Sequence, residues 1–180
     1  ADHWFHLTHL LVDGGKMSKS LGNFYTLDQI EAAGFTGNEL RYVLISAHYR
    51  QPLNFVARDA DGKETFPALS GARHALERIA KFAAALRERI PMQQVAIADV
   101  TGYDQFRGLA AAERGAFAAA YEGLLNDLNT PEALGQIFSA LKEVKPAELG
   151  PESALREWRG LHFVMEALGL RIRELKEETV

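Results

Sequence analysis

The stretch Leu-Leu-Val-Asp-Gly-Gly-Lys-Met-Ser-Lys-Ser-Leu-Gly-Asn-Phe, residues 10–24, joins an apolar run to a polar segment that has no hydrophobic period. The apolar run, residues 8–12, lacks helical spacing and predicts a short buried strand. Asp13-Gly14-Gly15 ends this strand, because glycine permits the backbone angles of a turn. Residues 16–24 are therefore expected to form a loop between a strand and a helical region.

Capping signals predict two short helices after this loop. Thr26 is expected to cap the first helix with its hydroxyl. Thr36-Gly37-Asn38-Glu39 fits a capping box for the second, which should end at Tyr49-Arg50-Gln51-Pro52, because the residue before proline avoids helical angles. Residues 53–66 are irregular, and their turn-like centre at 59–62 allows a small hairpin.

From residue 68 onward the apolar residues recur at intervals of three and four, which predicts helices throughout. A linker is expected over 91–102 and a long helix over about 103–126. A third helix should start at Asn129-Thr130-Pro131-Glu132, a cap followed by proline in the first turn, and a fourth should start at Gly150-Pro151. Long helices with short connections favour an antiparallel bundle.

The expected fold class is therefore mainly α. A short strand and loop lead into a compact helical connector, and an antiparallel four-helix-type bundle follows. Two parts are expected, residues 1–66 and residues 67–180.

The overall composition limits the functions that the chain could have. It has 180 residues, of which 47% are hydrophobic and 24% charged, so a packed core is expected. A net charge of −4 argues against a protein whose whole surface binds nucleic acid. Without cysteine, disulfides and thiolate metal sites are excluded. No apolar run approaches the roughly 20 residues of a membrane span and no signal pattern opens the chain, so a cytoplasmic location is expected.

Two lysines stand three residues apart in the expected loop. Lys16 and Lys19 carry compact charges on long stems, which suit phosphate oxygens, and the hydroxyls of Ser18 and Ser20 add donors. Flanking glycines would let the loop close and reopen as a lid. On charge alone a solvated basic turn is the commoner interpretation. The position of the intact pentapeptide, residues 16–20, between a strand and a helix is the context that the phosphate-handling interpretation requires.

Lys16-Met17-Ser18-Lys19-Ser20 matches the second signature of class I aminoacyl-tRNA synthetases, and its surroundings resemble cysteinyl-tRNA synthetase. The resemblance covers about residues 3–170. The segments that carry it are Trp4-Phe5-His6, Val12-Asp13, residues 16–24, Glu39-Leu40-Arg41-Tyr42, Ser46-Ala47-His48-Tyr49-Arg50, Pro52-Leu53-Asn54-Phe55, residues 72–78 and residues 129–134.

The resemblance implies an enzyme that activates cysteine with ATP and transfers it to tRNA(Cys). It implies that Lys16 and Lys19 are catalytic and contact the ATP phosphates, with Lys19 the stronger candidate for stabilising the transition state. Met17, Ser18 and Ser20 would complete the ATP-binding loop.

The resemblance also implies parts that this sequence lacks. The nucleotide-binding domain with the first signature and the zinc ligands would precede residue 1, and the anticodon-reading domain would follow residue 180. Zinc and ATP would thus belong to the parent enzyme, with no metal site here. The missing nucleotide-binding domain would be a partner, and the chain alone is expected to be inactive. Residues 57–66 resemble an insertion relative to the family pattern.

Several other residues have both a functional and a structural interpretation. Arg41, His48 and Arg50 could contact the inner bend of tRNA, or Arg41 could brace a solvated helix face. His3, His6 and His9 make a poor metal site, because a spacing of three in a strand puts neighbours on opposite faces. His6 aligns with a histidine near the family's active site and could line it. In the last helix, core packing is expected for Trp158, Phe163 and Met165.

Two rival functions remain open. A related ligase that joins cysteine to an amino-sugar would share the loop and need no tRNA-contacting surface. A free-standing helical module that binds tRNA or a protein would not need the lysines. Binding of tRNA with and without Lys16 and Lys19 separates these possibilities.

Overall fold

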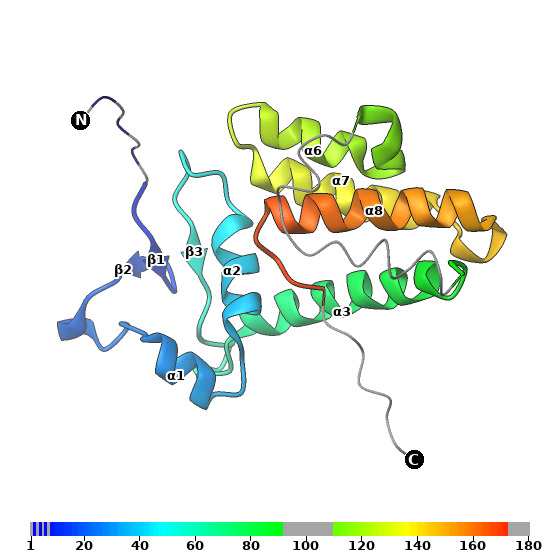
Figure 1. The fold of residues 1–180 in the computed structure, drawn as a ribbon. Helices are drawn as coiled ribbons and strands as arrows, with labels where there is room; N and C mark the ends of the chain where they lie inside the picture. The colour runs from blue at the N-terminus through cyan, green and yellow to red at the C-terminus, as the bar shows by residue number, and fades with distance from the viewer. Residues whose placement is uncertain (1, 3, 5, 7, 92–109, 173–180) are drawn as a thin grey trace, which may run out of the picture. The chain divides into compact units, whose positions relative to one another are not determined.

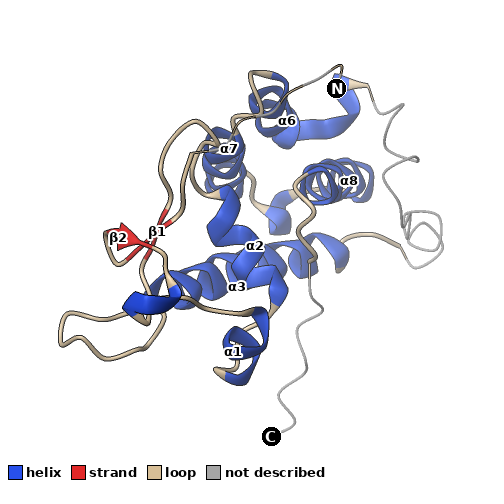
Figure 2. Cartoon of the chain, turned by 90° about the vertical axis from the view of Figure 1, so that its left-hand side faces the viewer, coloured by secondary structure: helices blue, strands red, loops and turns tan. Residues whose placement is uncertain are grey.

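The computed structural model describes residues 2, 4, 6, 8–91 and 110–172. These residues are mainly helical, and their strands form one small three-stranded sheet (Figures 1 and 2). The chain divides into two compact units, Ala1–Ala75 and Leu76–Val180. The division falls inside α3, Pro67–Arg87, so one helix contributes to both units.

The sheet of the first unit brings together segments that lie far apart in the sequence. β1, Leu11–Val12, pairs antiparallel with β2, Gly15–Lys16, and parallel with β3, Asn54–Phe55. Asp13 and Gly14 link β1 to β2 with positive φ angles of 49° and 77°, as a two-residue type I′ turn requires. The strand expected over residues 8–12 is thus limited to two residues, and Lys16, the first residue of the expected loop, is the last residue of β2.

The helices of the first unit start where their caps predict. α1, Leu27–Ala32, is capped by Thr26, and α2, Gly37–Ile45, begins with the capping box between Thr36 and Glu39. The expected end of α2 near residue 49 is wrong. The hydroxyl of Ser46 donates to the carbonyl oxygen of Val43 at 2.7 Å, and this local bond competes with continuation of the helix.

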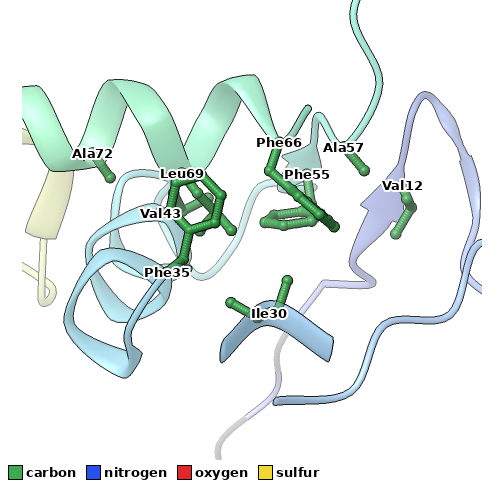
Figure 3. Packing of buried hydrophobic residues seen from close by; sticks show 9 residues of the cluster. All are labelled: Val12, Ile30, Phe35, Val43, Phe55, Ala57, Phe66, Leu69 and Ala72. Carbon is green, nitrogen blue, oxygen red and sulfur yellow. The ribbon is translucent and has the colours of Figure 1, made fainter. Parts of the chain in front are cut away.

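The core of the first unit lies between the sheet, α1, α2 and the first half of α3 (Figure 3). Phe66 packs edge-on against Phe35, with ring centroids 6.0 Å apart. Glu39 is buried beside this core, where its carboxylate accepts hydrogen bonds from Thr36 and pairs with Arg73 at 3.4 Å. The nine buried residues of the cluster are Val12, Ile30, Phe35, Val43, Phe55, Ala57, Phe66, Leu69 and Ala72.

The described residues of the second unit are mostly helical. α6, Ala118–Leu125, packs on α7, Thr130–Glu143, and the 3₁₀ helix η2, Ala111–Phe117, packs on α8, Pro151–Ala167. A short 3₁₀ helix, Pro146–Glu148, lies between α7 and α8. The expected cap of α7 is confirmed, since the Asn129 side chain accepts from the backbone N–H of Glu132 at 3.2 Å. Trp158, Phe163 and Met165 are buried, which confirms their expected packing role.

The long helix expected over 103–126 is wrong in the part that the structure describes. Residues 111–117 form the 3₁₀ helix, and Gly115 breaks it with φ 55° and ψ −141° before α6 begins. A side chain at Gly115 would overlap the carboxylate of Glu157, and one at Gly160 would overlap the carbonyl oxygen of Arg114. The chain therefore packs tightly on α8 as a 3₁₀ helix followed by α6, instead of forming one continuous helix. The expected linker over 91–102 falls outside the described residues from residue 92, as does the expected helix up to residue 109.

Candidate functional site

Residues 16–24, the signature loop, run from β2 to α1 (Figure 1). The Asn23 side chain closes the loop across its base. Its oxygen accepts from the backbone N–H of Ser18 at 2.8 Å, and its nitrogen donates to the carbonyl oxygen of Lys16 at 3.1 Å. One amide side chain thus fixes the backbone on either side of Met17.

A single turn of 3₁₀ helix, η1 at Lys19–Leu21, shapes the far side of the loop. The Ser18 hydroxyl oxygen accepts from the N–H of Leu21 at 3.3 Å, and the Ser18 and Ser20 hydroxyl oxygens are 3.1 Å apart. Gly22 ends the turn with φ 66° and donates its N–H to Lys19 at 3.2 Å. This positive φ favours glycine, so Gly22 is needed to turn the chain back towards Asn23.

The loop presents its charges outward and its methionine inward. Lys16 and Lys19 are exposed, whereas Met17 is half-buried against the core of the first unit. The Lys19 ammonium lies 5.6 Å from the centroid of the Phe24 ring. Two exposed ammonium groups and two hydroxyls on a closed turn can bind an oligophosphate.

Apolar side chains are also exposed around the loop. Leu21, Phe24 and Leu27 are 68%, 41% and 49% exposed. This part of the surface therefore combines cations with apolar groups, as sites for an aromatic ligand with phosphates do.

Tyr25 follows the loop and links it to the segment after β3. Its hydroxyl donates to the Glu64 carboxylate at 2.9 Å, and its ring packs edge-on against Phe66 with centroids 5.2 Å apart. Burial, and then the hydrogen bond to Glu64, raise the pKa of Tyr25 above its ordinary value of 10.0.

The three residues considered for tRNA contact lie in and after α2. Arg41 is an exposed residue of α2, whereas His48 and Arg50 lie beyond its end. His48 stacks on Tyr49 with ring centroids 4.6 Å apart, and the Arg50 guanidinium lies 4.9 Å from the Tyr49 ring centroid. The structure thus gathers His48 and Arg50 around one ring.

The histidines near the N-terminus do not form a metal site in the part of the chain that is described. His6 stacks on Trp4 with centroids 6.5 Å apart, His9 is exposed, and His3 lies outside the described residues. Within those residues no group of three or more His, Asp or Glu side chains could hold a metal ion. The zinc that the resemblance implies therefore does not fit the residues described here.

The sequence predicts a turn at Asp13-Gly14-Gly15, but not the hydrogen bonds that close the loop and connect it to the segment after β3. Asn23 was expected only to lie in the loop, although a Gly-Asn pair often marks a turn. Asp13-Gly14 carries the usual signal of a two-residue hairpin. The bond between Tyr25 and Glu64 has no signal in the sequence, because it joins residues 39 apart.

Comparison with known proteins gives this geometry its context. Residues 1–62 match the family model described as tRNA synthetases class I (C) catalytic domain. The cysteine–tRNA ligase of Opitutus terrae is 37% identical over 170 residues, which are 94% of this chain and 29% of that protein. The chain is homologous to cysteine–tRNA ligases. Those of Chlamydia caviae and Chlamydia abortus are 36% and 39% identical over 78% of the chain and 26% of each ligase.

The chain therefore spans less than a third of the length of these cysteine–tRNA ligases. The match to the Opitutus terrae ligase extends into both compact units, and the family model lies within the first. None of the helices in the described ranges is long and apolar enough to cross a membrane.

Proposed function

We propose that this chain is the part of a cysteine–tRNA ligase that handles the phosphates of ATP and contacts tRNA. The observation that carries the proposal is the signature loop, an intact Lys-Met-Ser-Lys-Ser turn closed by Asn23, with both lysines exposed. The homology to cysteine–tRNA ligases supports this assignment over a solvated basic turn.

The reaction has two steps. A carboxylate oxygen of cysteine attacks the α-phosphorus of ATP, the bond to the β-phosphate oxygen breaks, and pyrophosphate leaves. A ribose hydroxyl at the end of tRNA(Cys) then attacks the adenylate carbonyl, and AMP leaves. Negative charge grows on the pyrophosphate in the first step, so a cation placed there stabilises the transition state.

In this proposal, Lys19 and Lys16 stabilise the leaving pyrophosphate. Lys19 opens the 3₁₀ turn and Lys16 ends β2, so both side chains start from ordered backbone. Met17 anchors the loop in the core, and the hydroxyls of Ser18 and Ser20 complete the ATP-binding surface. Holding these groups in place before the reaction lowers the cost of reorganisation during it.

Arg41, His48 and Arg50 are proposed to contact the tRNA backbone. Phosphate contacts by such side chains position an RNA without reading its sequence. The helices of the second unit are proposed to form an antiparallel four-helix-type bundle that binds tRNA. The corresponding domains are residues 1–66, which end the catalytic domain, and residues 67–180.

The 180-residue chain alone is proposed to be inactive, because it spans under a third of the homologous ligases. The proposed partners are tRNA(Cys) and the remaining nucleotide-binding domain, in a cytoplasmic enzyme whose zinc ligands lie outside this chain.

The test is cysteine-dependent exchange of pyrophosphate into ATP by a graft. In the graft, this chain replaces the matched segment of the Opitutus terrae ligase. The wild-type graft should be active and the isolated chain inactive. Lys19→Ala in the graft should lower kcat by about 10²-fold, the effect of removing one preorganised group that stabilises charge. Lys16→Ala should lower it about tenfold.

Lys63→Ala is the matched control, because it removes an exposed lysine of the same unit outside the loop. Exchange of pyrophosphate into ATP by the isolated chain would contradict the proposal that the chain alone is inactive. A folded wild-type graft without activity, or a Lys19→Ala graft as active as Lys63→Ala, would contradict the proposed function. Cysteine transfer to an amino-sugar rather than to tRNA would favour the first rival, and tRNA binding by a folded but inactive graft would favour the second.

A further inference from the structure

The segment of residues 54–66, here called the brace, contacts the chain just before the signature loop. The Asn54 side chain accepts a hydrogen bond from the N–H of Gly14 at 2.8 Å. The Asp13 carboxylate accepts from the N–H groups of Ala57 at 2.8 Å and Arg58 at 3.2 Å. Three hydrogen bonds thus fix the turn that leads into Lys16.

The brace also contacts the chain just after the loop. Glu64 accepts the hydrogen bond from the Tyr25 hydroxyl. The Tyr25 ring rests on two aromatic residues of the brace, Phe55 and Phe66, with centroids 6.1 Å and 5.2 Å away. The chain therefore contacts the same segment, the brace, just before and just after residues 14–24.

Internal hydrogen bonds make the brace a single body. Arg58 and Glu64 form an antiparallel bridge, and the N–H of Asp59 donates to the carbonyl of Lys63 at 2.9 Å. The Asp59 carboxylate accepts from the N–H groups of Asp61 at 3.1 Å and Lys63 at 2.9 Å. Glu64 is thus paired with Arg58, and Ala57 is bonded to Thr65, so the contacts before and after the loop belong to one hydrogen-bonded segment.

We propose that the brace holds the two ends of the signature loop at a fixed separation, and that Glu64 is a positioning residue for Lys19 that acts through Tyr25. The inference rests on the proposed function for its catalytic part. A loop with both ends fixed samples fewer conformations. A catalytic group works best within about 0.5 Å of its productive position, so loosening one end should lower the rate.

The first experiment measures hydrogen exchange in the 180-residue chain and requires no activity. The reporters are the amides of Ser18, Leu21 and Gly22, which the structure pairs with groups of the loop itself. Tyr25→Phe and Glu64→Gln should each speed their exchange by about three- to tenfold, the range that one lost hydrogen bond produces. Amides of α8 should keep their wild-type rates.

Asp61→Asn is the matched control. It makes the same carboxylate-to-amide change on the same exposed hairpin, and the Asp61 side chain accepts no hydrogen bond that the structure shows in the described residues. Its loop amides should exchange at wild-type rates. Equal rates in Glu64→Gln, Tyr25→Phe and Asp61→Asn would overturn the proposal.

The second experiment measures pyrophosphate exchange in the graft. Tyr25→Phe and Glu64→Gln should lower kcat about three- to tenfold and leave the KM for cysteine unchanged. If the brace acts through Lys19, neither change should lower kcat further in a Lys19→Ala background. A merely structural role would reduce the rate equally in both backgrounds, which would overturn the positioning role.

The two experiments test the proposed function and the role of the brace separately. An inactive wild-type graft contradicts the proposed function and with it the catalytic part of this inference, whereas hydrogen exchange still decides whether the brace holds the loop. An active graft with unchanged loop exchange in both variants overturns the brace alone.

Discussion

Tyr25 makes the stability of the first unit depend on pH in the alkaline range. Its pKa lies above 10.0 in the folded chain, because of burial and the bond to Glu64. An unfolded tyrosine titrates near 10. Above that pH the folded chain keeps a proton that the unfolded chain has lost, so this contribution is complete below about pH 10 and is lost as the pH rises through the folded pKa.

We therefore expect the free energy of unfolding to fall more steeply between about pH 9.5 and 11 in wild type than in Tyr25→Phe. Glu64→Gln should give an intermediate slope, because burial of Tyr25 remains while the carboxylate is gone. Urea titrations at several pH values measure this. Identical pH dependence in all three proteins would show that the proton of Tyr25 does not matter to folding.

At the scale of single residues, the sequence predicted the features that depend on residues close together in the chain. The helix starts at Thr26, Thr36 and Asn129 are confirmed, because each depends on a hydrogen bond between a backbone N–H and a side chain three residues apart in the sequence. The intact pentapeptide predicted the candidate loop. The roles of Asn23 and Glu64 were not predicted, since the first depends on how the loop closes and the second on a contact across 39 residues.

At the scale of elements, α8 and the 3₁₀ helix η2 approach closely enough to exclude a methyl group. A Cβ at Gly160 would overlap the Arg114 carbonyl oxygen, which is backbone and cannot rotate away. Gly160→Ala should therefore destabilise the second unit by about 2–4 kcal/mol, although alanine is the better helix former. Thermal or urea unfolding measures the loss.

Gly135→Ala in α7 is the control for this substitution. It also lies inside a helix, but beyond the neighbouring residues of its own helix no described atom is within 4 Å of the added Cβ. It should stabilise the chain by about 0.5–1 kcal/mol through helix propensity alone. The packing of η2 on α8 would be contradicted if both variants gained stability.

The same contact explains the main error in the expected fold. An alanine-rich stretch with apolar residues at helical spacing predicts a long helix over 103–126. Gly115, however, places its backbone against Glu157 in a conformation that only glycine adopts readily. Sequence periodicity reports which face is apolar, and it does not report that α8 and η2 approach so closely that neither Gly115 nor Gly160 has room for a side chain.

At the scale of the whole molecule, the first unit should bind tRNA mainly through phosphates. If Arg41 and Arg50 each contact one phosphate, the variant with both changed to alanine should weaken binding for every tRNA tested. Its plot of log affinity against log salt concentration should become shallower by about 1–2 units. Fluorescence titrations of the 180-residue chain at several salt concentrations measure this.

A fair comparison for this variant is Lys63→Ala, which removes an exposed cation of the first unit that lies outside the proposed tRNA contacts. It should change the slope by less than the arginine variant does. An equal change would mean that the RNA is attracted to the chain as a whole, and the proposed contacts of the first unit would be withdrawn.

The helix α3 carries part of both hydrophobic cores. Leu69 and Ala72 belong to the core of the first unit, whereas Leu86 lies in a buried cluster of the second with Ile90, Ala154 and Trp158. Starting a helix is costly and extending one is not. Each core therefore packs against turns of a helix that the other core also helps to form. Unfolding of one unit should lower the stability of the other. Because the boundary between the units lies within a helix, we expect the free energies of unfolding of the two units to depend on one another.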